Sequence, residues 1–361
     1  MNVIDLFCGC GGFSNGFSKA GFNIVLGIDM WSDAIVTYLK NHPGAKAITD
    51  DITNVTPAEI LKQAEISADE VDVIIGGPPC QGFSISGKRL IDDPRNKLYK
   101  SFVEMVKNIQ PKMFVMENVP GLLSMGKGAV RDQILEDFSN AGYVVRTKIL
   151  TASDYGVPQA RRRVFFVGIN PNKIINTSEF IFPEPSHGEK EGLIPFVTCE
   201  DALSDLDFIS DEIPLPDKTN YVMPPQSDYQ AMMRSKSAEL LNHVATIHNQ
   251  KTKEIIAMVP DGENYKSLPE ELWQTRKVHI AWTRMNSKKP CFTIDTGHNH
   301  HFHYRANRVP TVRESARIQS FSDDFEFIGI KTSQLKQVGN AVPPILAEAV
   351  ANEVRKVIER G

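Results

Sequence analysis

A single cysteine lies in the stretch GGPPCQGFSISGKR, residues 76–89. Cys80 follows two prolines and stands among glycines and serines, whereas a cysteine that only packs a core is usually surrounded by Val, Leu and Ile. Glu117 stands near the end of the apolar run MFVMEN, and Arg161 and Arg163 lead into another such run, RVFFVGI. A thiolate is favoured by nearby positive charge, and a carboxylic acid can protonate a ring nitrogen. Together these residue types are suited to nucleophilic attack on a heterocycle.

A glycine-rich turn, DLFCGCGGFSNGF, follows the first apolar run and contains Gly9 and Gly11. A dinucleotide fingerprint G-x-G-x-x-G needs a third glycine where this chain has Ser14, which weakens the hypothesis of a nicotinamide oxidoreductase. Asp29 ends the second apolar run, where an acid can accept hydrogen bonds from a ribose, and Asp51 follows the third and could bind an adenine amino group. Each carboxylate alone would more often be a helix cap. Their places after successive strands favour an adenosyl ligand without a diphosphate, such as S-adenosylmethionine.

The elements that must position these residues alternate between short apolar runs and amphipathic stretches. We expect strands over 2–7, 23–29, 46–49, 71–77, 113–119, 143–150 and 163–169, and helices over 13–21, 33–42, 56–64, 96–110 and 129–142. This order predicts an α/β fold with a doubly wound, mostly parallel sheet, in which ligands bind beyond the carboxyl ends of the strands. A last helix over 343–360 could return to cover the sheet near the first strand.

From about residue 182 the periodicity gives way to proline-rich, acidic sequence, which predicts a second, smaller and loop-rich domain. Residues 184–230 contain 11 Asp+Glu against 2 Lys, whereas residues 231–310 contain 12 Lys+Arg against 7 Asp+Glu. The second stretch could face nucleic-acid phosphates, although a solvated basic surface is an equal alternative. It also contains GHNHHFHYR, whose histidines are spaced unlike a zinc site and are expected on the surface or against a DNA backbone.

The composition of the chain and its cysteines restrict the class of protein. The chain has 361 residues, of which 41% are hydrophobic and 23% charged, as in globular proteins with a substantial core. No basic segment precedes the first apolar run, and no run of about 18 apolar residues occurs, so we expect a cytoplasmic protein without a membrane partner. Five cysteines at irregular spacing fit free thiols in a reducing compartment. Cys8 and Cys10 are expected to be small residues of a tight turn, not metal ligands.

The motifs also occur in the order and spacing of a known family. The chain resembles the bacterial cytosine-C5 DNA methyltransferases of restriction-modification systems in DLFCGCGGF, GPPCQGFS, ENVPGLL, QARRRVFFVG, RESARIQSF and QVGNAVPP. The resemblance covers about residues 1–182 and 309–361. It implies an S-adenosylmethionine-dependent methyltransferase fold with a catalytic and cofactor-binding domain at 1–182, a target-recognition domain at 183–308, and a returning segment at 309–361 that completes the catalytic domain.

The resemblance further implies methyl transfer from S-adenosylmethionine to C5 of a cytosine in a short duplex DNA sequence, with S-adenosylhomocysteine as product and no metal. Cys80 would attack C6 of a flipped-out base, and Glu117 would bond and protonate N3. Arg163 would hold the base's O2, and Arg161 would support the cysteine loop. The cofactor would be surrounded by Phe7, Gly9, Gly11, Asp29, Met30, Asp51, Ile52, Gly77, Pro79, Leu98, Asn340 and Val342, and the DNA would be contacted by Gln81, Ser84, Lys88 and Arg89.

Alternatives remain open on the sequence alone. Cys291 in KPCFT resembles a triplet of a related RNA-modifying branch, but GPPCQGFS favours the DNA enzymes. A catalytically silent DNA-binding relative should lack the nucleophile or the acid, and both are present. The expected partners are double-stranded DNA and a restriction endonuclease that acts separately, and the chain is expected to be a monomer. The DNA sequence recognised, and whether such an endonuclease exists, do not follow from the residues.

Overall fold

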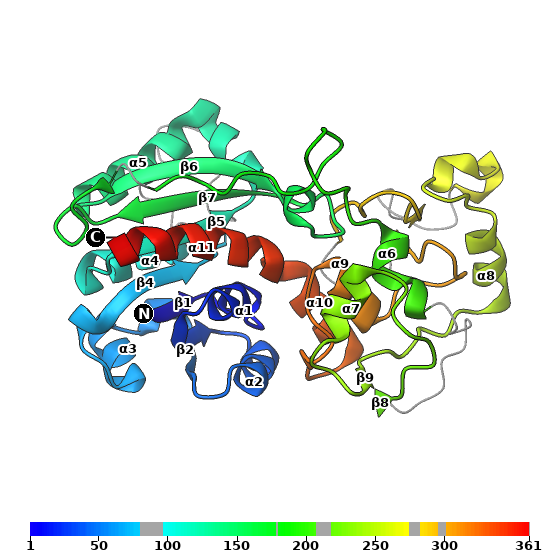
Figure 1. Ribbon diagram of the computed structural model, residues 1–361, viewed down its shortest axis with the longest axis horizontal. Coiled ribbons are helices and arrows are strands. Elements are labelled where there is room, and N and C mark those ends of the chain that lie inside the picture. Colours follow the sequence, from blue (N-terminus) through cyan, green and yellow to red (C-terminus); the bar gives the residue numbers. More distant parts are fainter. Residues whose placement is uncertain (80–96, 178–179, 207–217, 274–281, 295–300, 361) are drawn as a thin grey trace. The chain divides into compact units, whose positions relative to one another are not determined.

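The computed structural model describes residues 1–79, 97–177, 180–206, 218–273, 282–294 and 301–360. The chain forms two compact units (Figure 1). The first contains Met1–Thr151, Arg162–Glu184 and Pro344–Gly361, and the second contains Ala152–Arg161 and Pro185–Pro343. Of the segment 309–361, the part from Pro344 onward therefore belongs to the first unit and the rest to the second.

The first unit is built on a seven-stranded sheet with the strand order β3-β2-β1-β4-β5-β7-β6. Every neighbouring pair is parallel except the two that involve β7, which runs antiparallel to β5 and β6. Residues 152–161 alone connect β6 to β7, and a parallel crossover needs a dozen residues or more, so β7 must reverse direction. The predicted α/β fold with a mostly parallel sheet is confirmed, with strands β1 (Asn2–Leu6), β2 (Asn23–Asp29), β3 (Lys46–Thr49), β4 (Val71–Gly76), β5 (Met113–Asn118), β6 (Val144–Thr151) and β7 (Arg162–Ile169).

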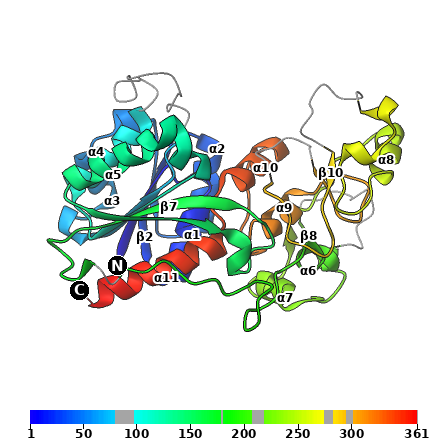
Figure 2. The same cartoon turned by 90° about the horizontal axis from the view of Figure 1, so that it is seen from above.

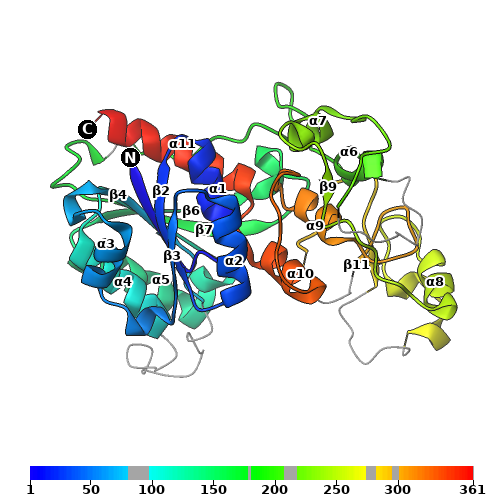
Figure 3. The same cartoon turned by 90° about the horizontal axis from the view of Figure 1, so that it is seen from below.

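Helices cover both faces of this sheet (Figures 2 and 3). On one face lie α1 (Gly12–Lys19), α2 (Ser32–Asn41) and α11 (Pro344–Arg360), and on the other lie α3 (Pro57–Ala64), α4 (Lys97–Ile109) and α5 (Ala129–Asn140). The predicted start of α3 is confirmed, because Thr56 and Glu59 form a reciprocal capping box with Pro57 at the first helical position. Among the described helices, none is both long and apolar enough to cross a membrane.

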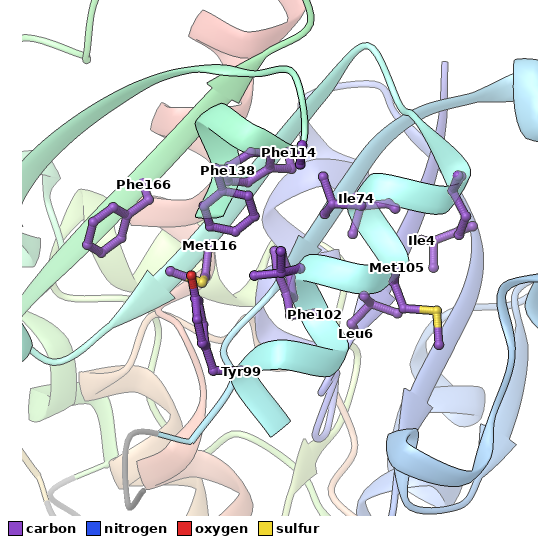
Figure 4. Packing of buried hydrophobic residues seen from close by; sticks show 14 of the residues in the cluster. Ile4, Leu6, Ile74, Tyr99, Phe102, Met105, Phe114, Met116, Phe138 and Phe166 are labelled. Atoms are coloured by element: carbon purple, nitrogen blue, oxygen red, sulfur yellow. The ribbon is translucent and has the colours of Figure 1, made fainter. Parts of the chain in front are cut away.

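A hydrophobic core between the sheet and the helices α3 to α5 fixes the central strands (Figure 4). Phe114 of β5 stacks on Phe138 of α5 with ring centroids 4.1 Å apart, and Phe102 of α4 meets Phe138 edge-on at 6.2 Å. All three rings are fully buried. Such aromatic pairs add about 0.5–1.5 kcal/mol each to the burial of their area. The register of β1, β4 and β5 is therefore held by packing on this face.

On the opposite face, α11 packs directly on α1, the helix that follows β1. The expected return of the last helix to this part of the sheet is confirmed. Arg355 Nη1 donates a hydrogen bond of 3.0 Å to the carbonyl of Ala20, just past the end of α1. Gly16 allows the close approach, because a Cβ atom added there would lie 2.6 Å from both Glu348 N and Pro344 O and still closer to Ala347 Cβ.

The second unit consists of short elements joined by long irregular segments, as the proline-rich sequence predicts. Its two small sheets are two-stranded. The described elements are α6 (Cys199–Leu203), β8 (Lys218–Thr219), α7 (Asp228–Arg234), β9 (Leu240–Leu241), α8 (Gln250–Ala257), β10 (Thr283–Arg284), β11 (His301–Phe302), α9 (Val312–Ile318) and α10 (Lys331–Asn340), with short 3-10 helices between them.

Buried arginines hold this second unit together. Arg317 of α9 is fully buried and binds both Asp205 and Asp323, the latter through hydrogen bonds of 2.9 and 2.7 Å. Arg308 makes two hydrogen bonds of 2.7 Å to the Glu314 carboxylate. A buried charge is tolerated only when it is paired and hydrogen-bonded, so α9 is fixed by specific partners on separate segments.

The surface placement expected for the histidines of GHNHHFHYR is wrong for His303. Its side chain is 1% exposed, and its Nδ1 accepts hydrogen bonds from the backbone N–H groups of Arg305 and Ala306. The ring therefore shapes the turn after β11 from inside the unit. His298 and His300 lie outside the described residues.

Gly16→Ala is expected to lower stability despite the better helix propensity of alanine, because the new methyl group must displace the α11 backbone. Overpacking of this kind costs about 1–3 kcal/mol. The measurement is the midpoint of thermal unfolding. Gly121→Ala is the matched control, since nothing lies within 4 Å of its added Cβ. An unchanged midpoint for Gly16→Ala would contradict the close packing of α1 and α11.

Candidate active site at the carboxyl ends of the strands

Four neighbouring parallel strands end together at one edge of the first unit. Leu6 pairs with Ile28 of β2 and with Gly76 of β4, and Gly76 pairs with Met116 of β5. The segments that follow these strands must therefore meet, although they come from widely separated parts of the sequence. They carry most of the residues that sequence analysis proposed for the cofactor and the acid.

The turn after β1 is tied to the end of β2 by Asp29. Gly9 N donates to Asp29 Oδ2 and Trp31 N donates to Oδ1, both at 2.9 Å. Burial raises the pKa of Asp29, and the hydrogen bonds from Trp31 and Gly9 partly offset that effect. Phe7 has a φ of 63°, which is unusual for a residue with a side chain and marks a sharply bent backbone. The structure thus brings Phe7, Gly9 and Asp29 together.

Cys8 and Cys10 lie in this turn as buried small residues, as predicted. They are 6% and 2% exposed. Burial raises the pKa of both thiols, that of Cys10 to about 12. Because the thiolate is the nucleophilic form, neither residue is suited to attack at neutral pH.

Asp51 and Ile52 have structural roles of their own besides the proposed contacts with the cofactor. Asp51 Oδ1 accepts hydrogen bonds from the N–H and the hydroxyl of Thr53, both at 2.9 Å, so the carboxylate caps the 3-10 helix Ile52–Asn54. The alternative that this carboxylate caps a helix is therefore confirmed. The Ile52 side chain is 4% exposed and belongs to the core, whereas Met30, next to Asp29, is 69% exposed. A contact of Ile52 with a ligand would have to come from its backbone.

Glu117 lies beside the end of β4 and forms an ion pair with Arg163. The distance from Arg163 Nε to Glu117 Oε1 is 2.7 Å, and the two side chains are 14% and 12% exposed. A Cβ atom added at Gly77 would lie 3.2 Å from Glu117 Oε2, so the glycine leaves room at the carboxylate. Arg162, between the two motif arginines, is exposed. The Glu117–Arg163 pair was not predicted from the sequence.

Asn118 is a residue whose part in the site sequence analysis missed. Its Nδ2 donates a hydrogen bond of 2.8 Å to the carbonyl of Pro78, and its Oδ1 accepts one of 2.9 Å from Val119 N. The side chain is 7% exposed. It joins the end of β5 to the segment that leads to residue 80. The only sequence signal is its position directly after Glu117 in the ENV triplet.

The remaining proposed site residues lie in several places. Arg161, Asn340 and Val342 belong to the second unit, where Arg161 is 2% exposed and its carbonyl accepts a hydrogen bond from Ala152 N. Pro79 is exposed and Leu98 is half-buried against the core. Cys80, Gln81, Ser84, Lys88 and Arg89 lie outside the described residues. Within the described ranges, no three His, Cys, Asp or Glu side chains could hold a metal ion.

Comparison with known proteins assigns the family. The model of C-5 cytosine-specific DNA methylase matches residues 1–356. The chain belongs to this family. Both the enzyme class and the methyltransferase fold expected from the sequence motifs are therefore confirmed.

Curated relatives of this methylase extend over nearly its whole length. It is 42% identical to the type II methyltransferase M.DdeI of Desulfomicrobium norvegicum, with 98% of this chain and 88% of the relative covered. It is 39% identical to the type II methyltransferase M1.HphI of Haemophilus parahaemolyticus, with 99% and 87% covered.

Solved structures agree with the fold of this methylase. A putative DNA modification methyltransferase encoded within a prophage (E. coli) matches with a TM-score of 0.80 and 30% identity, over 99% of both chains. The S. pombe Dnmt2 methyltransferase matches with a TM-score of 0.57 and 16% identity, over 100% of this chain and 99% of that one, which supports the fold alone.

Asn118→Asp is expected to destabilise the first unit. A carboxylate oxygen would replace the Nδ2 donor and face the Pro78 carbonyl in a buried place. Leaving such a group unpaired costs about 1–3 kcal/mol or more. The check is chemical denaturation next to Asn172→Asp, the same change at an exposed loop position. Equal midpoints for the two variants would show that the link to Pro78 contributes nothing.

Proposed function

We propose that this methylase transfers a methyl group from S-adenosylmethionine to C5 of a cytosine in a specific short sequence of duplex DNA, through a covalent bond between Cys80 and C6 of a flipped-out base. The observation that carries the proposal is the position of Glu117. This acid lies at the end of β5, beside Gly77 and paired with Arg163, on the strand next to the one that leads to Cys80.

The residues after β1, β2 and β3 fit an adenosyl group. Both Asp29 oxygens accept backbone N–H groups, and the carboxylate has further lone-pair sites that a ribose hydroxyl can donate to. Asp51 uses Oδ1 for its cap, and within the described ranges no side chain or backbone group donates to Oδ2, which can therefore accept a hydrogen bond from an amino group. S-adenosylmethionine, when bound here, supplies an electrophilic methyl group. Phe7, Gly9, Gly11, Met30 and the backbone of Ile52 would complete this side of its pocket.

The protein's part in the chemistry is to make C5 nucleophilic. The Cys80 thiolate forms a bond to C6 while Glu117 donates a proton to N3, which converts C5 into an enamine carbon. After C5 has taken the methyl group from the sulfonium, a base would remove the C5 proton, the electron pair of that bond would expel the Cys80 thiolate from C6, and N3 would return its proton to the Glu117 carboxylate, which restores the aromatic ring. Base flipping costs a few kcal/mol, which contacts in the pocket must recover.

Arg163 would change partner in this sequence of events. Its guanidinium pairs with Glu117 through Nε, and the proposed role is to hold O2 of the flipped cytosine. Arg163 therefore keeps the acid in place until the base arrives. Asn118 would keep Pro78, and with it the start of the cysteine loop, next to the acid.

Duplex DNA is the proposed macromolecular substrate, with the second unit as the part that reads its sequence. Asn340 and Val342 would contact the cofactor, Arg161 would support the cysteine loop, and Gln81, Ser84, Lys88 and Arg89 would contact DNA. We further propose that the chain acts in the cytoplasm as a monomer, beside a restriction endonuclease that acts separately. Size-exclusion chromatography with light scattering tests the monomer.

Cys80→Ser is expected to abolish methylation and to leave binding of S-adenosylhomocysteine unchanged, because the hydroxyl is a much weaker nucleophile. Purified protein is incubated with S-adenosylmethionine and unmethylated duplex DNA, and 5-methylcytosine is mapped at single-base resolution. A duplex with 5-fluorocytosine at the mapped position should trap the wild-type protein covalently, because fluorine cannot leave as a proton, and should not trap the variant. Methylation by Cys80→Ser, or transfer to RNA instead of DNA, would overturn the proposal.

Glu117→Gln is expected to lower kcat by about 10²–10⁴-fold, the usual contribution of a general acid. The amide can still form a hydrogen bond but cannot deliver a proton to N3. Steady-state kinetics on the mapped DNA sequence give the effect, with Glu136→Gln on the exposed face of α5 as the matched control. A kcat within threefold of wild type would rule out Glu117 as the acid.

A further inference from the structure

Four buried polar side chains lie against the glycine turn from inside the first unit. Asp5 of β1 and Ser14 of α1 are 1% and 0% exposed, and Tyr38 and His42, from α2 and its end, are 0% and 6% exposed. None of them belongs to the proposed catalytic or ligand-binding set. Because their atoms are covered by protein, a ligand on the surface of the turn can be affected by them only through the turn itself.

Tyr38 and His42 fill the space that two glycines leave. A Cβ atom added at Gly11 would lie 2.7 Å from His42 Cδ2 and 2.9 Å from Tyr38 Cδ2. A Cβ atom added at Gly27 of β2 would lie 2.8 Å from the Tyr38 hydroxyl. The two rings pack on each other with centroids 4.7 Å apart. The two rings therefore pack between the turn and β2, the strand that ends in Asp29.

A hydrogen bond connects His42 to the turn, and others connect Ser14 to its buried neighbours. His42 Nε2 lies 3.1 Å from the carbonyl oxygen of Gly11. Burial lowers the pKa of His42 to about 4, so the ring is neutral at physiological pH, and the carbonyl partner requires the proton to be on Nε2. On the other side, Ser14 Oγ donates a hydrogen bond of 2.6 Å to Asp5 Oδ2 and lies 3.4 Å from the Tyr38 hydroxyl.

We propose that His42, Tyr38 and Ser14 are positioning residues that hold the Phe7–Gly11 turn in the shape that binds S-adenosylmethionine. The inference rests on the proposed function, since it takes this turn as the cofactor site. Asp29 fixes the turn at Gly9, and His42 fixes it at Gly11, so the backbone is held at two points before any ligand arrives. A site held in its bound shape avoids the cost of ordering it on binding.

The test compares His42→Leu with His42→Gln. Leucine removes the donor to Gly11, whereas the glutamine amide nitrogen can take the place of Nε2. Loss of one hydrogen bond of about 0.5–1.5 kcal/mol corresponds to an affinity loss of about 2- to 12-fold. Calorimetry with S-adenosylhomocysteine should show this loss for His42→Leu and its recovery in His42→Gln. In kinetics, KM for S-adenosylmethionine should rise by the same factor, while kcat and KM for DNA stay within about twofold.

Two further variants separate positioning from general loss of stability. Ile134→Val opens a small cavity in α5, on the other face of the sheet, and should lower the unfolding midpoint without changing the affinity for S-adenosylhomocysteine. Ser14→Ala should weaken binding in the same direction as His42→Leu, and it serves if the leucine variant does not fold. Wild-type affinity in the variants that fold, or an equal affinity loss in Ile134→Val, would overturn the inference. If the wild-type protein itself does not bind S-adenosylhomocysteine, the proposed cofactor role fails, and the inference with it.

Discussion

The site depends on the parallel pairing of β2, β1, β4 and β5. Parallel neighbours end at the same edge, so a turn after residue 6, an acid at residue 29 and an acid at residue 117 become neighbours without being close in sequence. The strands must hold their register for this to work, since a slip by one residue would turn Glu117 to the other face. The buried aromatic cluster of α4, α5 and β5 stabilises that register and so belongs to the functional design as much as the polar residues do.

Residues with local signals were predictable from the sequence, and residues that act through tertiary contacts were not. The strands and helices of the first unit follow from apolar runs and from caps such as Thr56, and the pairing of Gly9 with Asp29 follows from the edge they share. Asn118 and the Glu117–Arg163 pair could not be derived, because they require knowing that β7 lies next to β5 and that Pro78 faces β5. In the sequence, only the short connection before β7 indicates that this strand runs antiparallel to its neighbours.

Glycines in this chain serve packing as much as backbone freedom. Gly16 admits α11, and Gly11 and Gly27 admit the rings of Tyr38 and His42. A glycine that is read from sequence alone indicates a turn or a break, and in a strand it often marks a close approach of another group. Which group approaches is a property of the fold, and for this reason the supporting layer beneath the turn was invisible in the sequence.

The number of basic residues in part of the second unit does not measure how much positive charge its surface carries. Residues 231–310 carry an excess of basic residues. However, Arg284 and Arg308 are 5% and 1% exposed and make hydrogen bonds inside the unit. Arg284 donates to the carbonyls of Val259, Ile256, His303 and Ala306, and Arg308 to Glu314. These two guanidinium groups stabilise the unit and are not displayed to DNA phosphates. The proposed DNA-facing surface of this unit would therefore depend on the remaining lysines and arginines of this stretch, and the sequence excess overstates its strength.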